Sequence, residues 1–161
     1  MDVLVPFAVA EPKSRLAPVL TPDERREFAR AMLADVLDAI VLAGGTPHIL
    51  ATEPFDPAVD IPGSLDPPVV VDDRPLTDAV NTALERHGHT ASGSTIATDT
   101  TGDSAFPCED GVAVVMADLA LATPDALTRL FEPDRDGNPS EESPADVTIA
   151  PGRGGGTNAL V

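Results

Sequence analysis

Positive charge is scarce in this sequence. Ten Lys and Arg residues stand against 27 Asp and Glu residues, the formal net charge is −17, and Lys13 is the only lysine. Such a surface repels nucleic acids and anionic membranes, so we expect neither as a partner. The acidic side chains also repel one another, and molar salt, which shortens the screening length to about 3 Å, removes that repulsion. The composition therefore predicts a halophilic protein, with an ordinary acidic protein as the alternative.

The sequence also gives no indication of an internal disulfide, a membrane span or a secretion signal. The one cysteine, Cys108, can form no internal disulfide, which agrees with a reducing cytosol. No apolar run is long enough to cross a bilayer, and the first residues lack the basic and apolar regions of a signal peptide. With 42% hydrophobic residues, the 161 residues can build one core. We therefore predict a cytoplasmic protein with a single domain, 1–161.

Short apolar runs rich in β-branched residues alternate with stretches of helical periodicity. Strands are predicted at 3–9, 46–52, 69–71, 112–117 and 147–150, and helices at 21–43, 76–87 and 123–131. The first helix has the clearest start, because Thr21, Pro22 and Glu24 form a capping box. Its apolar face is predicted to include Phe28 and Val36. The alternation predicts an α/β fold, with a mostly parallel, twisted sheet and helices on both faces.

Two acidic stretches interrupt this alternation. Residues 88–110 are mostly Thr, Ser, Gly, Asp and Ala, so we predict a mobile acidic insertion before the central strand. Residues 133–144 have a similar composition. His87 and His89 flank the start of the first stretch, but without a third His or a nearby Cys we expect surface residues rather than metal ligands.

Charged residues follow two of the predicted strands. Asp118 follows the central strand, and ligands bind at the carboxyl edge of open α/β sheets. A carboxylate there can hold Mg²⁺ against a substrate phosphate, or can simply cap the next turn. Lys13 and Arg15 follow the first strand, where cations in so acidic a chain favour a polyanion such as a nucleoside triphosphate. The alternative is surface pairing with Glu11 or Asp23.

The last residues carry a glycine-rich motif. Gly154, Gly155 and Gly156 lie between Arg153 and Thr157, directly after the last predicted strand. Consecutive glycines let the backbone approach a ligand closely and expose N–H groups that can bind an anion. The spacing differs from the dinucleotide-binding and Walker motifs. The alternative is a flexible linker.

Five segments occur in one order along nearly the whole chain: PKSRL (12–16), PVL (18–20), ER (24–25), MADL (116–119) and PGRGGGTNAL (151–160). Together they resemble the 2-phospho-L-lactate guanylyltransferase family. The resemblance implies the GT-A-like nucleotide-diphospho-sugar transferase fold and a role in making coenzyme F-420. The sequence departs from the family at Thr77, where Asn is usual, and in the greater length of the loop 88–110.

The resemblance also implies a reaction. The phosphate of 2-phospholactate attacks the α-phosphorus of GTP, and lactyl-2-diphospho-5'-guanosine and pyrophosphate are formed. In this chain Lys13, Ser14 and Arg15 would bind the triphosphate, and Asp118 would hold Mg²⁺. Arg153 and the segment from Gly154 to Thr157 would bind the acceptor, with Thr157 assigned to it by resemblance. A homodimer is likewise implied by the family.

Other functions remain open from the residues alone. One is a related nucleotidyltransferase whose acceptor is a molybdopterin or a sugar 1-phosphate. Another is a nucleotide-binding module without catalytic activity.

The sequence after the glycine-rich motif predicts a further strand from residue 158 that no helix follows. A parallel strand at that place would leave an exposed sheet edge, so we expect the domain to be C-terminally incomplete. We expect the 161 residues alone to bind GTP weakly, to aggregate and to turn over negligibly. Otherwise the second metal ligand should lie among Asp72, Asp73 and Asp78.

Overall fold

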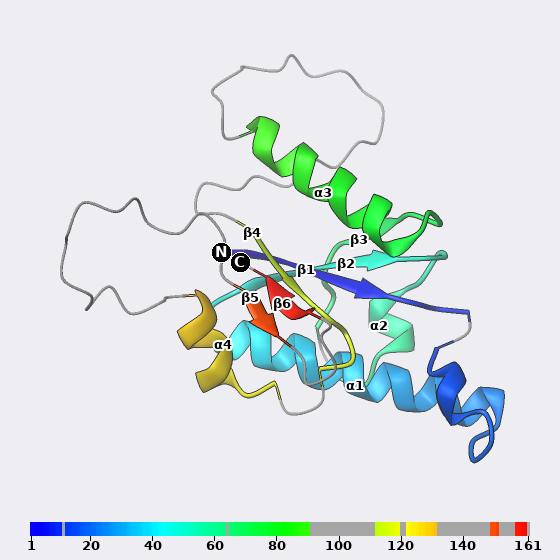
Figure 1. The fold of residues 1–161 in the computed structure, drawn as a ribbon. Coiled ribbons are helices and arrows are strands. Elements are labelled where there is room, and N and C mark those ends of the chain that lie inside the picture. Colours follow the sequence, from blue (N-terminus) through cyan, green and yellow to red (C-terminus); the bar gives the residue numbers. More distant parts are fainter. Residues whose placement is uncertain are drawn as a thin grey trace, which may run out of the picture.

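The fold is a six-stranded sheet with helices on both faces (Figure 1). The computed structural model describes residues 1–10, 12–63, 65–90, 112–119, 122–131, 149–151 and 157–160. The strands are β1 (Asp2–Phe7), β2 (Thr46–Ala51), β3 (Val69–Val71), β4 (Val112–Val115), β5 (Ile149–Pro151) and β6 (Thr157–Leu160). Their order across the sheet is β3-β2-β1-β4-β6-β5. The predicted strands are thus confirmed within about two residues at most ends.

The sheet is parallel from β3 to β4, and β6 runs antiparallel between β4 and β5. The predicted mostly parallel α/β fold is therefore confirmed. The prediction of a parallel strand at an exposed edge from residue 158 is wrong, because β6 is antiparallel and is paired on both sides. Residues 152–156 alone separate β5 from β6, and a parallel crossover needs a dozen residues or more.

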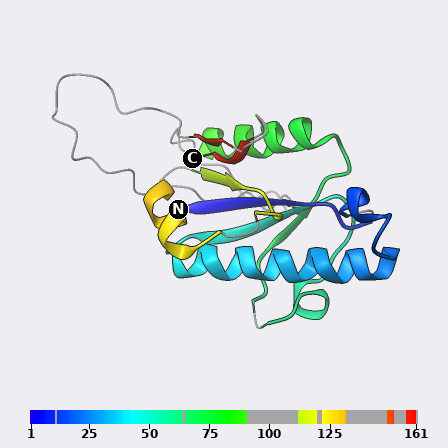
Figure 2. The same ribbon diagram turned by 60° about the horizontal axis from the view of Figure 1, so that its bottom comes forward.

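The helices are η1 (Ser14–Leu16), α1 (Pro22–Leu42), α2 (Pro57–Asp60), α3 (Leu76–Thr90) and α4 (Pro124–Phe131). Figure 2 shows α1 and α3 on opposite faces of the sheet. The predicted capping box is present, with the Thr21 N–H donating to Glu24 Oε2 over 2.8 Å. The helix α3 includes Gly88 to Thr90, so the predicted insertion does not begin at residue 88, and residues 91–110 lie outside the described part.

The face of α1 that meets the sheet overlaps the predicted face only in part. Val36 is buried as predicted, but Phe28 is 45% exposed, and Leu33 and Leu37 are fully buried instead. The helix has two neighbouring apolar stripes, and the packing against β1 and β2 selects the one that begins at Ala29. The helix ends at two glycines, where Gly44 has a φ of 81° and the Gly45 N–H donates to Ile40 O over 2.9 Å. This is a Schellman motif, as expected from the glycine pair.

Two cores stabilise the sheet. The larger core packs α1 and α4 on one face through Val3, Val5, Leu33, Ile40 and Leu127. The smaller core packs α3 on the other face, where Ala79 and Ala83 meet Leu4, Leu50 and Val114. Both cores place the strands firmly, so the residues that follow the strands leave the sheet from fixed positions. In the described part of the chain, no helix is both long and apolar enough for a membrane span.

The hydrogen-bonded ladder between β1 and β4 ends before the carboxyl end of β1. The strand β1 pairs with β2 from Asp2 to Phe7, but its pairing with β4 extends only from Asp2 to Leu4. The carbonyls of Met1 and Phe7 accept hydrogen bonds from the β2 side. Alternation along the strand therefore turns the backbone of Pro6 toward β4, beyond the last pair. A proline without an N–H costs no hydrogen bond there.

Candidate functional site

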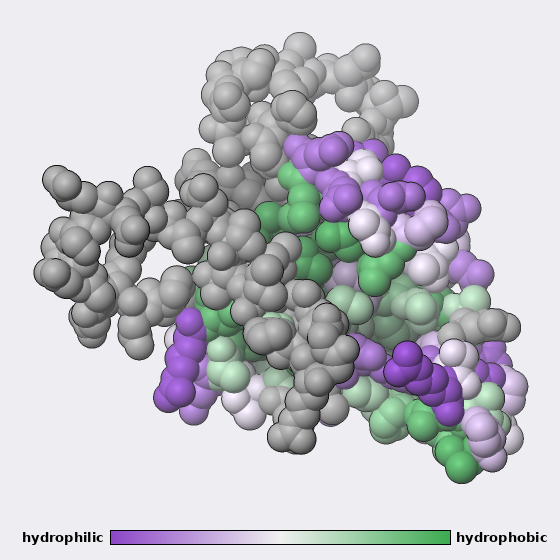
Figure 3. Space-filling model, in the orientation of Figure 1, coloured by the Kyte–Doolittle hydropathy of each residue, from purple (hydrophilic) through white to green (hydrophobic). Residues whose placement is uncertain are grey.

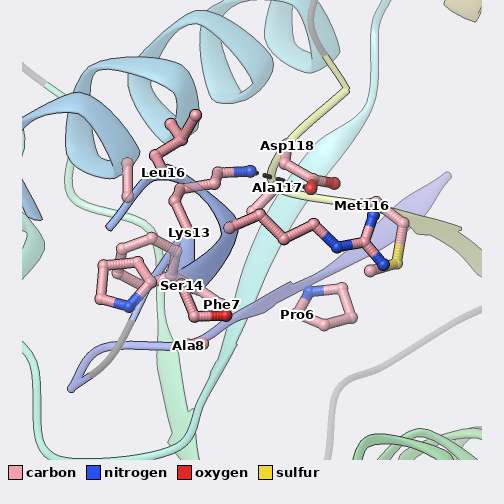
Figure 4. Close-up of a pocket in the computed structure, with 12 residues that line it drawn as sticks. Pro6, Phe7, Ala8, Lys13, Ser14, Leu16, Met116, Ala117 and Asp118 are labelled. Carbon is pink, nitrogen blue, oxygen red and sulfur yellow. Dashed lines mark hydrogen bonds and ion pairs between the residues drawn. The ribbon is translucent and has the colours of Figure 1, made fainter. Parts of the chain in front are cut away.

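A pocket of about 420 Å³ lies at the carboxyl ends of β1 and β4 (Figure 4). Its volume is in the range of small-molecule sites. The chain continues from β1 to β2 on one side and returns as β4 on the other, so the pocket lies at the point where strand order reverses, which is the usual ligand site of such sheets. Its lining comes from the end of β1, the segment around η1, helix α1 and the turn after β4: Pro6, Phe7, Ala8, Pro12, Lys13, Ser14, Arg15, Leu16, Ala29, Met116, Ala117 and Asp118.

An ion pair between Lys13 and Asp118 lies in this pocket. Lys13 Nζ is 2.8 Å from Asp118 Oδ2, although the two residues are 105 positions apart in the chain. The side chain of Lys13 is 20% exposed and that of Asp118 is 56% exposed. The two residues singled out after separate strands are therefore brought together. The alternative pairing with Asp23 is wrong, because Asp23 pairs with Arg26; Glu11 lies outside the described residues.

Asp118 occupies a turn that follows β4. The strand ends at Val115, and the Leu119 N–H donates to Met116 O over 3.1 Å, which closes the turn around Ala117 and Asp118. The carboxylate therefore extends from a short turn on a buried strand. Such an attachment restricts where its oxygens can lie, as a binding carboxylate requires.

Lys13 has an unusual backbone conformation. Its φ of 55° and ψ of 44° lie in the left-handed region, and it is the one non-glycine residue with positive φ in the described part of the chain. This conformation costs a residue with a Cβ about 1–2 kcal/mol. Strain of this kind is found where a site fixes a side chain, which agrees with a functional role for Lys13.

Arg15 supplies a second cation. It lines the pocket, is exposed, and makes no ion pair or hydrogen bond with the other described residues. Its neighbour Ser14 is exposed as well and lines the same pocket. Two cations in one crevice of a chain with a net charge of −17 favour an anionic ligand.

The donor set fits a metal ion that is shared with a substrate. In the described ranges, no three His, Cys, Asp or Glu side chains lie close enough together to form a metal cage. Asp118 Oδ2 contacts Lys13, whereas no hydrogen bond to its Oδ1 is found from a described residue. One carboxylate can hold Mg²⁺ when substrate phosphates and water complete the octahedron. The residues present therefore fit Mg²⁺ bound together with a polyphosphate.

The other carboxylates considered as metal ligands do not join Asp118. Asp72 follows β3 and accepts hydrogen bonds from Arg74, including one from Arg74 Nε over 2.8 Å. This hydrogen bonding by Arg74 lowers the pKa of Asp72 to about 2. Asp73 and Asp78 also lie in no cluster of metal-binding side chains within the described part. Asp72 is thus engaged in a local pair.

The glycine-rich segment is described only at its two ends. Arg153, Gly154, Gly155 and Gly156 lie outside the described residues, whereas Thr157 begins β6. Pro151 pairs with Thr157, and Val115 pairs with Ala159. Because β6 is antiparallel to β4, this register places the backbone of Thr157 beyond the end of β4, at the same edge as the turn of Asp118. The backbone placement agrees with the prediction for Thr157, while its contacts stay a prediction.

Part of the pocket was not found from the sequence. Pro6, Phe7, Leu16 and Met116 form apolar walls around the charged residues. A pocket with apolar walls and few charged groups is typical of sites for nucleotides and other small molecules. In the sequence, these residues were marked only by their place near strand ends, where core residues also occur.

Comparisons with known proteins agree with these features. A family profile described as "Guanylyl transferase CofC like" matches residues 1–161. Proteins named 2-phospho-L-lactate guanylyltransferase are similar along the whole chain: 51% identity for that of Halorubrum lacusprofundi, 52% for that of Halomicrobium mukohataei and 48% for that of Haloferax volcanii. The chain spans about 60% of the length of these relatives.

A solved structure shows the same fold. It is provisionally named a nucleotide-diphospho-sugar transferase, from Desulfovibrio desulfuricans G20, and aligns with a TM-score of 0.63 at 17% identity. The alignment covers 99% of this chain and 61% of that protein. At this identity the likeness concerns the fold, and it confirms the predicted GT-A-like class.

Proposed function

Because this chain belongs to the CofC-like guanylyl transferase family, we propose that it is the nucleotide-binding part of a 2-phospho-L-lactate guanylyltransferase. Its reaction would join GTP to (2S)-2-phospholactate in coenzyme F-420 biosynthesis. The observation that carries the proposal is the pocket in which Lys13 and Asp118 meet, 2.8 Å apart, beside the exposed cation of Arg15. The names of the relatives supply the two substrates.

The proposed reaction exchanges one phosphoanhydride for another. A phosphate oxygen of 2-phospholactate attacks the α-phosphorus of GTP, and a new P–O–P bond forms. The bond from the α-phosphorus to the bridging oxygen of the β-phosphate breaks, and pyrophosphate leaves with the electron pair. Both reactants are anions, so the protein must supply cations and alignment more than proton transfer.

The described residues can meet these needs. Lys13 and Arg15 would bind the triphosphate, with Ser14 as a further hydrogen-bond donor beside them. Asp118 would hold Mg²⁺, which when bound neutralises charge on phosphate oxygens as pyrophosphate departs. Without nucleotide, Lys13 Nζ contacts Oδ2 of Asp118. A bound triphosphate would offer Lys13 a stronger anionic partner, and the carboxylate of Asp118 would then be free to bind the metal ion. Lys13 thereby couples the binding of nucleotide and metal ion.

The acceptor would bind at the same edge. The proposal assigns the phosphate and carboxylate of 2-phospholactate to Arg153, to the Gly154–Gly156 backbone and to Thr157. Support comes from the register of β6, which places the Thr157 backbone beyond the end of β4. An acceptor between this backbone and Asp118 would face the α-phosphate of a nucleotide held by Lys13 and Arg15.

The decisive experiment follows pyrophosphate release in molar KCl. The present chain and the product of the complete gene are each incubated with GTP, Mg²⁺ and one acceptor: 2-phospholactate, a molybdopterin or a sugar 1-phosphate. Release with 2-phospholactate alone would support the proposal, and release with another acceptor would replace the substrate. If both proteins bind GTP but release no pyrophosphate with any of the acceptors, a nucleotide-binding module would be favoured.

The salt environment and the assembly are part of the proposal. Several relatives come from halophilic archaea, and the net charge of −17 fits a cytoplasm with molar salt. Melting in a KCl series checks this: equal melting temperatures in dilute and molar KCl would contradict it. A homodimer is proposed from family membership, and sedimentation in molar KCl tests it.

A further inference from the structure

The segment that carries Lys13 is attached to neighbouring elements on both sides. At its start, the Val9 N–H donates to Thr52 Oγ1, beyond the end of β2, over 3.1 Å. At its end, the Lys13 carbonyl accepts the first hydrogen bond of η1, from the Leu16 N–H, over 2.9 Å. Neither contact explains why Lys13 keeps a left-handed backbone. Such a conformation persists only where surrounding groups determine it.

Arg25 supplies a contact at the required place. It lies in the second turn of α1, and its Nη1 donates to Pro12 O at 3.5 Å, the long end of the hydrogen-bond range. The Pro12 carbonyl and the Lys13 N–H belong to one planar peptide unit. A hydrogen bond to this carbonyl therefore restricts the orientation of the peptide plane, and that orientation limits the φ of Lys13. The start of α1 is itself fixed by the capping box at Thr21.

The other features of Arg25 do not suggest a role in stability. In a chain with 27 acidic residues, Arg25 makes no ion pair within the described part, whereas Arg26 pairs with Asp23 and Arg30 pairs with Asp60. Its Nε is buried without a hydrogen-bond partner among the described residues. A buried donor without a partner costs free energy, so this placement is retained for something other than stability.

We infer that Arg25 is a positioning residue for Lys13. It holds the Pro12–Lys13 peptide so that the ammonium group of Lys13 meets Asp118 in the pocket. The inference deepens the proposed function, on which its effect on GTP binding rests. The orientation of Lys13 itself can be measured without any nucleotide.

Because Lys13 is the only lysine, its reactivity reports its surroundings. The wild-type chain and three variants, Arg25→Met, Arg25→Lys and Arg26→Met, are acetylated in molar KCl without nucleotide. Peptide mass spectrometry follows the rate at Lys13 separately from that at the N-terminus. Arg26→Met removes the same charge from the adjacent, exposed residue of the same helix. A fourth variant, Leu127→Ala, opens a cavity under α4 and destabilises the fold away from the start of α1.

We expect Arg25→Met to raise the acetylation rate of Lys13 and to weaken GTP binding, each by about tenfold. Arg25→Lys should lie between Arg25→Met and the wild type, and Arg26→Met should match the wild type. Equal rates for Arg25→Met and Arg26→Met would overturn the inference. So would an equal rise for Leu127→Ala at the same loss of melting temperature. If wild type binds no GTP, the proposed function fails while the acetylation result still decides the role of Arg25.

Discussion

Two side-chain pairs lie at opposite edges of the same sheet, and their surroundings differ. At the amino edge, Asp2 of β1 forms a hydrogen bond with His48 of β2, with 3.0 Å between Oδ1 and Nε2. These side chains are 15% and 9% exposed. At the carboxyl edge, Lys13 and Asp118 are 20% and 56% exposed and line a pocket. The first pair joins strands inside the protein, whereas the second presents both charges to a ligand.

The difference shows that a contact between two polar side chains does not by itself mark a site. Each pair links residues far apart in sequence. What distinguishes Lys13 and Asp118 is that both line the pocket at the carboxyl ends of β1 and β4. Mutations at the two edges should therefore affect different properties: ligand binding and turnover at one edge, and stability at the other.

The largest effect is expected at Asp118, the proposed metal ligand. Asp118→Asn keeps the size of the side chain but removes the charge that would hold Mg²⁺, so guanylyl transfer should fall by about 1,000-fold or more. Because the side chain is 56% exposed, the melting temperature should change little. Pyrophosphate release by the complete gene product measures turnover. Asp38→Asn on the exposed side of α1 is the control, and retained turnover in Asp118→Asn would remove Asp118 from the mechanism.

The second prediction is that substitution of Lys13 changes the affinities for GTP and for Mn²⁺ in opposite directions. Lys13→Met should weaken GTP binding by about 10- to 100-fold, because a charge-assisted contact to phosphate is lost. The same variant should bind Mn²⁺ more tightly without nucleotide, since no ammonium group then competes for Asp118 Oδ2. Calorimetry gives the first affinity and electron paramagnetic resonance of free Mn²⁺ gives the second.

Arg15→Met is the matched control for this pair of measurements. It removes a cation of the same pocket that contacts no described carboxylate, so it should weaken GTP binding and leave Mn²⁺ binding unchanged. Equal Mn²⁺ affinity in wild type and Lys13→Met would contradict the proposed competition.

At the opposite edge the expected loss is one of stability. Asp2→Ala removes a hydrogen bond to the buried His48 and should destabilise the fold by about 1 kcal/mol. GTP binding, measured well below the melting temperature, should be unchanged. Urea denaturation in molar KCl gives the first quantity. If a fully folded Asp2→Ala variant lost GTP affinity, the proposed difference in function between the two edges would be contradicted.

The smallest effect is expected at Asp72, which pairs with the exposed Arg74 at the carboxyl edge. Hydrogen bonding by Arg74 lowers the pKa of Asp72 from 3.8 to about 2. A lowered pKa stabilises the folded state above the unfolded value and loses this effect as the pH falls. The difference in melting temperature between wild type and Asp72→Asn should thus be constant above about pH 4.5 and shrink toward pH 2. A difference that grows on acidification would contradict this.

The sequence predicted local features better than the partners of distant residues. The capping box at Thr21 and the end of α1 at Gly44 depend on neighbours in the chain, and both are present. Lys13 and Asp118 were each identified from their place after a strand, but their direct contact depends on the parallel pairing of β1 with β4, which no local pattern encodes. Their chemical roles stay predictions.

The incorrect predictions have physical causes of the same kind. Phe28 was assigned to the buried side of α1, but the adjacent stripe through Leu33 and Leu37 meets the sheet. Periodicity gives a helix face within about one residue, and packing decides between neighbouring stripes. The direction of β6 was wrong because strand composition carries no direction, whereas the short connection from Pro151 to Thr157 does.

The distance in sequence between Lys13 and Asp118 has a consequence for how the chain folds. Helix α1 and strands β1 and β2 lie close together in the sequence and can associate early, whereas β4 reaches β1 only after a loop of about a hundred residues has closed. During synthesis, Lys13 emerges long before its partner exists. The contact between Lys13 and Asp118 is therefore expected to form late in folding. The acetylation rate of Lys13 during refolding would report when β4 docks against β1.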